Sequence, residues 1–348
     1  DIPLTSHLTR QPAMLDLVAS ALVATIVVFA VGMTVQLSLK LFGVDPMGAE
    51  LKDRGSPFRS ERDVRMLYPV VGMHLVQSLI MGWMYMQGAP LVKSLFQLEG
   101  AQDPGAHATA GALFALLVFA ATSVPGLALD YLIYKVRAST IAYFMVCNAI
   151  CTPAMGAVVG WWLAGYVEEA APAAGSGPLL QQLSSMPCTA IAASILFGAL
   201  GSIGLVRVTT HFNLFRLAPA VREETSKRRS PFRSMSHPYA HLVDYVVGPL
   251  SGAVTITLFY ALAFPLLAPH LPDPTCLCWH LTTGAAFGSL VWSMFTLHGL
   301  FINYCCYRVS IASFVLCALE TQASALLHGA VAALALAAAS GMQAVQGH

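Results

Sequence analysis

The residues with the clearest chemical potential are charged side chains set inside long apolar stretches. Glu320 lies twelve residues beyond Arg308, which at about 1.5 Å per helical residue puts its carboxyl near the middle of a membrane-spanning helix. Arg207 lies inside another apolar stretch. Because charges in hydrocarbon are costly and pairing neutralises them, we expect Glu320 and Arg207 to approach each other.

Other polar groups occupy similar depths and would complete a polar cavity around that pair. Histidines could relay protons or contact a solute near neutral pH, because their ordinary pKa is about 6.5. For each histidine, a purely structural hydrogen-bond network is the competing interpretation. The predicted substrate path comprises Glu320, Arg207, His74, His211, His298, Asn148, Asp130 and Asn303.

One short cluster has a spacing that suits a metal ion. His237, His241 and Asp244 follow a basic loop and would share one face of a helix, an arrangement that can ligate a metal. Pro238 weakens the helical assumption there. A solvated helix start is the alternative.

A second cluster lies on the predicted outer side. Cys276, Cys278 and His280 form a Cys-x-Cys-x-His string, and Cys188 lies near the same surface. Outward thiols meet an oxidising compartment, which favours a disulfide between Cys188 and either Cys276 or Cys278. A soft-metal site is the alternative.

The elements that must position these residues are long and apolar. The chain has 348 residues, of which 57% are hydrophobic and 10% charged, against about 45–50% and about 25% in soluble domains. This composition argues against a soluble enzyme, a disordered chain and a nucleic-acid binder. Eight apolar segments are long enough to cross a hydrocarbon core of about 30 Å, and they do not alternate as barrel strands do. They cover residues 14–43, 67–97, 107–134, 138–167, 187–216, 241–268, 279–304 and 308–340.

Basic residues predict the orientation of these spans. Of the 18 Lys and Arg residues, 15 lie in the connections after the first, third, fifth and seventh spans or at the span ends that border them. Cytoplasmic loops carry an excess of Lys and Arg, so these four connections are expected in the cytoplasm. Both termini then lie outside, in a multi-pass protein of a cell membrane of the bacterial inner-membrane type.

The two halves of the chain resemble each other. Ser-Pro-Phe-Arg-Ser occurs at 56–60 and at 230–234, and further matches follow in the same order at offsets of about 170–176 residues. They predict two four-helix repeats, 1–170 and 187–348, joined by an outer linker, 171–186. Each repeat has an even number of spans, so the chain returns to the same side of the membrane before the second repeat begins. Both repeats then insert in the same direction and are related by a pseudo-two-fold axis along the membrane normal.

The basic loops and the glycine pairs predict contacts. Clustered Lys and Arg at the inner leaflet attract anionic lipid headgroups, and Arg59 and Arg233 could also close the inner mouth through forked hydrogen bonds.

Gly156 with Gly160 and Gly284 with Gly288 are small-xxx-small pairs. These favour packing within the chain over a homodimer interface.

The fold class that follows is an all-α polytopic membrane protein with eight transmembrane helices. The expected function is a transporter or channel-like carrier for a small polar or ionic solute, with its path between the two repeats. The alternatives are an accessory or assembly subunit of a larger membrane complex that binds partners or lipid, and a metal- or haem-binding redox protein. Nucleotide-binding, hydrolase and zinc-protease motifs are absent from the sequence, so it points away from an enzyme, and no motif requires a cofactor.

Overall fold

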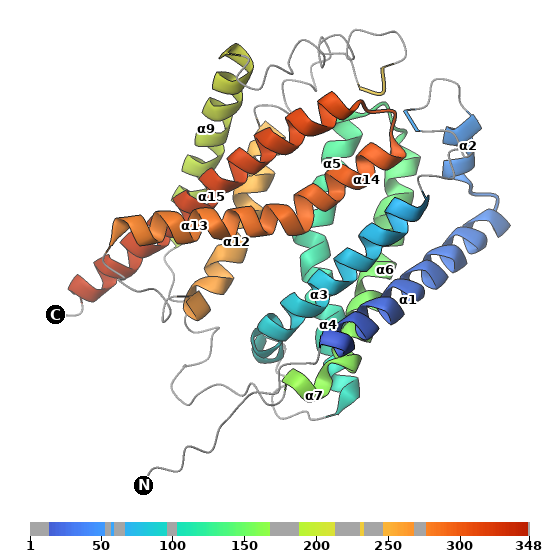
Figure 1. The fold of residues 1–348 in the computed structure, drawn as a ribbon, viewed down its shortest axis with the longest axis horizontal. Coiled ribbons are helices and arrows are strands. Elements are labelled where there is room, and N and C mark those ends of the chain that lie inside the picture. Colours follow the sequence, from blue (N-terminus) through green and yellow to red (C-terminus); the bar gives the residue numbers. More distant parts are fainter. Residues whose placement is uncertain are drawn as a thin grey trace. The chain divides into compact units, whose positions relative to one another are not determined.

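A computed structural model describes residues 14–52, 57–58, 67–95, 103–167, 188–212, 230–232, 246–267 and 276–346. Within these ranges the chain is helical, apart from two isolated backbone bridges (Figure 1). Long runs of Ala, Leu, Val and Ile explain the helices, since a backbone in hydrocarbon must satisfy its hydrogen bonds internally.

In this described part, six helices or continuous helix runs are long and apolar enough to cross a membrane, as in a multi-pass membrane protein. Two of them are continuous runs, one of α4 (Pro104–Val118), η2 (Phe119–Ser123) and α5 (Val124–Ile133), and the other of α13 (Leu277–Val291), η6 (Trp292–Thr296) and α14 (Leu297–Cys306). The other four are α1 (Met14–Leu41), α6 (Ala138–Trp162), α9 (Cys188–Phe212) and α15 (Ile311–Gln346).

Two further helices cover the remaining apolar segments of the sequence. They are α3 (Leu67–Leu95) and α12 (Gly248–Leu267). Neither is among the six candidate spans, although Gly248–Ala261 counts as a shorter apolar helix. The expected number of eight spans depends on these two helices and stays a prediction. The short helices α2 (Pro46–Lys52) and α7 (Ala164–Val167) complete the described elements.

The chain divides into two compact units. The first comprises Asp1–Asp45, Tyr68–Ser123 and Phe144–Leu180, and the second comprises Pro46–Leu67, Val124–Tyr143 and Gln181–His348. The second unit therefore includes two segments of the first predicted repeat.

The first unit is held together by small and polar contacts between helices. Thr25 of α1 and Ser78 of α3 share a hydrogen bond of 3.1 Å, and the Ser78 hydroxyl donates to the Met155 sulfur of α6 at 3.3 Å. Gly111 of α4 meets Gly156 of α6 so closely that a Cβ on Gly111 would lie 2.1 Å from the Gly156 carbonyl oxygen. Lipid gives helices no hydrophobic drive to associate, so close packing and hydrogen bonds take that role.

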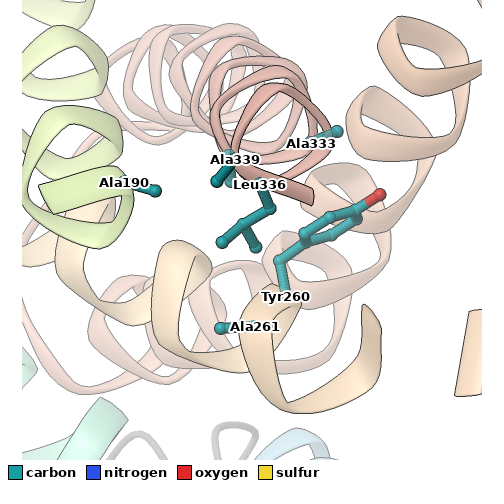
Figure 2. Close-up of a cluster of buried hydrophobic side chains, with 7 residues drawn as sticks. Ala190, Tyr260, Ala261, Ala333, Leu336 and Ala339 are labelled. Carbon is teal, nitrogen blue, oxygen red and sulfur yellow. The ribbon is translucent and has the colours of Figure 1, made fainter. Parts of the chain in front are cut away.

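In the second unit, α9, α12, α13 and α15 pack together, and α13 and α15 run beside each other (orange and red in Figure 1). Figure 2 shows part of the core, where Leu336 of α15 points toward Tyr260 and Ala261 of α12 and Ala190 of α9 lies nearby. Small residues bring α13 and α15 close, since a Cβ on Gly284 would lie 2.3 Å from the Gly329 carbonyl oxygen. The glycines therefore make contacts inside the chain, as their spacing predicts.

The helix runs of the two predicted repeats have matching lengths. The run from Pro104 consists of 15 α-helical, 5 π-helical and 10 α-helical residues, and so does the run from Leu277. The π-helical turn is rare in proteins and often marks a functional position. The two runs therefore match both in length and in the position of their π-helical turn.

A buried acid caps the start of α6. Glu50 of α2 is 1% exposed, and its Oε1 atom accepts hydrogen bonds from the Arg137 backbone N–H at 2.8 Å and from the Thr140 hydroxyl at 3.2 Å. At the start of α15, the Ser310 hydroxyl accepts a hydrogen bond from the Ser313 N–H at 3.2 Å. Arg137, directly before α6, has no acceptor in its side chain, and Glu50 of another helix binds its backbone N–H and the Thr140 hydroxyl instead.

We predict that Glu50→Ala lowers the free energy of unfolding by about 1–3 kcal/mol, because the buried N–H and hydroxyl donors lose their acceptor. Thermal unfolding of the purified protein in detergent measures this change. Asp45→Asn is the control, since the Asp45 carboxyl is exposed and its 3.9 Å pair with Lys40 is worth about 0–1 kcal/mol. Equal stability of the Glu50→Ala protein and the wild type would contradict the capping role.

Candidate functional site

The candidate site lies in the second unit, where α5 and α14 end. Asn303 of α14 donates a hydrogen bond from Nδ2 to Oδ1 of Asp130 on α5, at 2.8 Å, and both side chains are half-buried. The two residues occupy matching places in the predicted repeats. Both residues belong to the predicted path, and the structure joins them by this hydrogen bond.

Two stacked tyrosines follow this pair one helical turn later. Tyr134 and Tyr307 are buried, and their ring centroids lie 4.3 Å apart at an interplanar angle of 28°. The Tyr134 N–H donates to the Asp130 carbonyl at 2.9 Å, and the Tyr307 N–H donates to the Asn303 carbonyl at 2.8 Å. Matching backbone bonds thus place both rings directly beyond the polar pair.

The phenylalanine of each Ser-Pro-Phe-Arg-Ser motif packs on the tyrosine of the other predicted repeat. Phe58 forms a backbone bridge with Tyr307 and Phe232 forms one with Tyr134, with ring centroids 4.8 Å and 5.4 Å apart. The Arg308 N–H donates to the Pro57 carbonyl at 2.8 Å, and the Lys135 N–H donates to the Pro231 carbonyl at 2.9 Å. We call Phe58, Tyr134, Phe232 and Tyr307 the aromatic cluster.

The basic residues beside the aromatic cluster, Lys135 and Arg308, are exposed, and the Lys135 Nζ atom donates to the Ser230 carbonyl at 2.9 Å. Burial, with the nearby Asp130 carboxyl as a smaller cause, raises the pKa of the Tyr307 phenol, which therefore stays neutral. In the part of the chain that the structure describes, Asn303 is the hydrogen-bond partner of Asp130, and no cation pairs with it. A carboxyl group without a cationic partner is suited to binding a proton or a small cation.

The predicted Glu320–Arg207 pair lies on two antiparallel helices of the same unit. Ser202 of α9 donates to Ser324 of α15 at 2.9 Å. Arg207 lies five residues beyond Ser202, and Glu320 lies four residues before Ser324, so the antiparallel register brings them to the same level. Glu320 is half-buried and Arg207 is exposed. The ion pair itself stays a prediction.

The other predicted path residues are distributed over both units. His74 of α3 lies in the first unit with its ring edge-on to Phe29 at 5.4 Å, and Asn148 of α6 is half-buried in that unit. His298 of α14 is buried in the second unit. The remaining predicted residues or their side chains lie outside the described structure: His211, Arg59, Arg233, His237, His241 and Asp244.

The predicted outer cysteines are free thiols in the structure. Cys188 and Cys278 are exposed, Cys276 is partly exposed, and His280 is buried in α13. The disulfide therefore stays a prediction. Over the described ranges, no group of three or more His, Cys, Asp or Glu side chains is placed to hold a metal ion, so the soft-metal alternative gains no support.

Sequence reasoning missed two buried residues. Glu50 gave no signal, because it lies in a polar loop and its partner helix starts 88 residues later. His328 of α15 is 3% exposed. A signal for it existed, since Glu320, Ser324 and His328 follow at a spacing of four and share one helical face.

Comparison of this sequence with protein-family models and with curated proteins, and of its fold with solved structures, gives no match.

Proposed function

We propose that the protein is an integral membrane transporter or channel-like carrier for a small polar or ionic solute. The observation that carries this proposal is the Asp130–Asn303 hydrogen bond of 2.8 Å inside two apolar helix runs. Polar groups at such positions are costly, so they usually serve a solute or ion pathway. The path passes this pair, where segments of the two predicted repeats meet.

The carrier is proposed to consist of two parallel four-helix repeats, with eight spans. The equal lengths of the helix runs from Pro104 and Leu277 support this duplication. So do the matching glycine contacts, Gly111 with Gly156 and Gly284 with Gly329. Parallel repeats of this kind are common among transporters.

The end of the second unit that holds the aromatic cluster is proposed to face the cytoplasm of a bacterial-type inner membrane. Lys135, Arg137 and Arg308 are exposed there, as the positive-inside rule requires and as anionic lipid headgroups would favour. The aromatic cluster would then close the inner end of the path. Four rings held by backbone bonds exclude water more effectively than a single side chain would.

We predict that vesicles containing the protein take up at least one small solute faster than protein-free vesicles. Stopped-flow light scattering measures this with gradients of potassium chloride, ammonium chloride, sodium acetate and urea. Asp130→Asn should reduce the protein-dependent rate by at least about tenfold, equivalent to about 1.4 kcal/mol in the barrier. Removing the charge while keeping the side-chain shape isolates the electrostatic contribution.

Asp45→Asn is the matched control, because it removes an exposed carboxyl outside the path and should leave the rate unchanged. Rates equal to those of protein-free vesicles for all four solutes would contradict the carrier. An Asp130→Asn protein with the wild-type rate would contradict the placement of the path.

A further inference from the structure

His328 is fixed inside the second unit by glycines on two other helices. A Cβ on Gly252 of α12 would lie 2.9 Å from its Cε1 atom, and a Cβ on Gly198 of α9 would lie 3.2 Å from its Cδ2 atom. The imidazole therefore fills space that only glycine leaves open. Its position is set by α9, α12 and α15 together.

One nitrogen of this imidazole has no hydrogen-bond partner in the described structure. The ring forms a hydrogen bond with the Gly198 backbone, whereas Nε2 is buried without a partner. The bonded nitrogen is therefore Nδ1, which donates its proton to the Gly198 carbonyl. Nε2 is left with a free lone pair, and leaving such a group unsatisfied costs about 1–3 kcal/mol. A proton or a donor molecule would satisfy it.

Polar side chains continue from His328 along the same helical interface. Ser324 and Glu320 precede it on α15 at steps of four residues, so the three lie on one face. Ser202 of α9 donates to Ser324 at 2.9 Å, and beyond Gly198 the Ser194 and Thr257 hydroxyls share a bond of 2.8 Å. We call this series the polar column, comprising Glu320, Ser324, Ser202, His328, Ser194 and Thr257.

The first unit carries sulfur at the matching positions. Cys147, Cys151 and Met155 lie on α6 at steps of four residues, each 173 residues before its counterpart in Glu320, Ser324 and His328. Ser78 donates to the Met155 sulfur there. Small and soft side chains therefore suffice for packing at this interface, so packing alone does not explain an acid and a histidine in the second unit.

We propose that the polar column conducts protons, with His328 Nε2 and the Glu320 carboxyl as its two proton-binding groups. This inference rests on the proposed transport function and names the coupling ion. A proton that adds to Nε2 forms an imidazolium, while Nδ1 keeps its bond to Gly198. Transfer breaks the Nε2–H bond and forms an O–H bond on Glu320. The Ser324 and Ser202 hydroxyls lie between the two groups on this helical interface, and water that enters the column would carry the proton across the remaining gaps.

Other titratable groups lie on the helices that pack against α15. His328 is the member of the polar column that lies against both Gly198 and Gly252. These helices carry cysteines on α9, α13 and α14. Their other described titratable or charged side chains are Arg207 on α9, Tyr260 on α12, His280 on α13, and His298 and Tyr304 on α14.

Proton flux through reconstituted vesicles tests the proposal. A pH dye inside the vesicles reports the decay of an imposed pH gradient, with potassium and valinomycin compensating the charge. We expect the wild type to dissipate the gradient, and His328→Met and Glu320→Gln to slow it by at least about tenfold. Met is the residue at the matching position of the first unit. Met155→Leu is the control and should keep the wild-type rate.

Solid-state 15N spectra of histidine-labelled wild type give a test that needs no folded variant. We expect the His328 ring signal to change from neutral imidazole to imidazolium as the pH is lowered through the acidic range. A signal that stays neutral, or a His328→Met protein with the wild-type proton flux, would overturn the proposal.

Light scattering on the same vesicles separates this proposal from the carrier function. Solute uptake without a protein-dependent pH change would overturn proton conduction and leave the carrier intact. A pH change without uptake of any of the four solutes would overturn the carrier and leave proton conduction intact.

Discussion

Gly288→Ala is expected to destabilise the second unit severely, although it adds one methyl group. A Cβ at this position would lie 2.0 Å from the Ala325 carbonyl oxygen and 2.9 Å from its carbon. Both atoms belong to the backbone of α15, so a side-chain rotation cannot relieve the clash. The helices must separate, which costs at least about 1–3 kcal/mol and opens the core formed by Ile256, Val291 and Ala325. Thermal unfolding and size-exclusion chromatography in detergent measure the loss.

Gly204→Ala on α9 is the matched control. A Cβ there would meet no atom within 4 Å, so the variant should be as stable as the wild type or more stable by up to about 0.5–1 kcal/mol, because alanine favours the helix. If Gly288→Ala and Gly204→Ala unfold at the same temperature, the close approach of α13 and α15 is wrong.

Tyr307→Ala is expected to have the second large effect on stability. Tyr307 is 2% exposed, and its ring stacks on Tyr134 while it also contacts Phe58. Removing a buried aromatic ring costs about 3–5 kcal/mol, because the protein loses the free energy of burying its apolar surface and a cavity remains. Loss of the ring should also loosen the Phe58 loop, which limited proteolysis of the purified protein would detect.

Tyr307→Phe separates the ring from its hydroxyl. It keeps the stacking surface and should retain most of the stability of the wild type. If Tyr307→Ala were as stable and as protease-resistant as Tyr307→Phe, the aromatic cluster would not hold the loop.

The sequence was sufficient to predict a multi-pass helical protein, because long apolar runs have few other solutions. It also predicted that Gly156, Gly160, Gly284 and Gly288 pack within the chain, since small residues at this spacing allow backbones to approach. The count of eight spans stays a prediction, because α3 is not among the six candidate spans and α12 contributes only a shorter apolar helix.

Contacts between distant segments were not predictable in the same way. The crossed packing of Phe58 on Tyr307 and of Phe232 on Tyr134 depends on tertiary structure, and the motif alone does not say which repeat it contacts. The cap on α6 is similar, because Arg137 offers no acceptor and the partner, Glu50, lies in another helix. The burial of His328 depends on glycines from two other helices.

The central claim is that a polar solute crosses the membrane past the Asp130 carboxyl. The most direct measurement is the ratio of protein-dependent uptake rates for Asp130→Asn and wild type in vesicles of equal protein content. A rate for the variant of about one tenth or less of the wild-type rate is predicted. Equal rates, with both proteins folded, would contradict the claim.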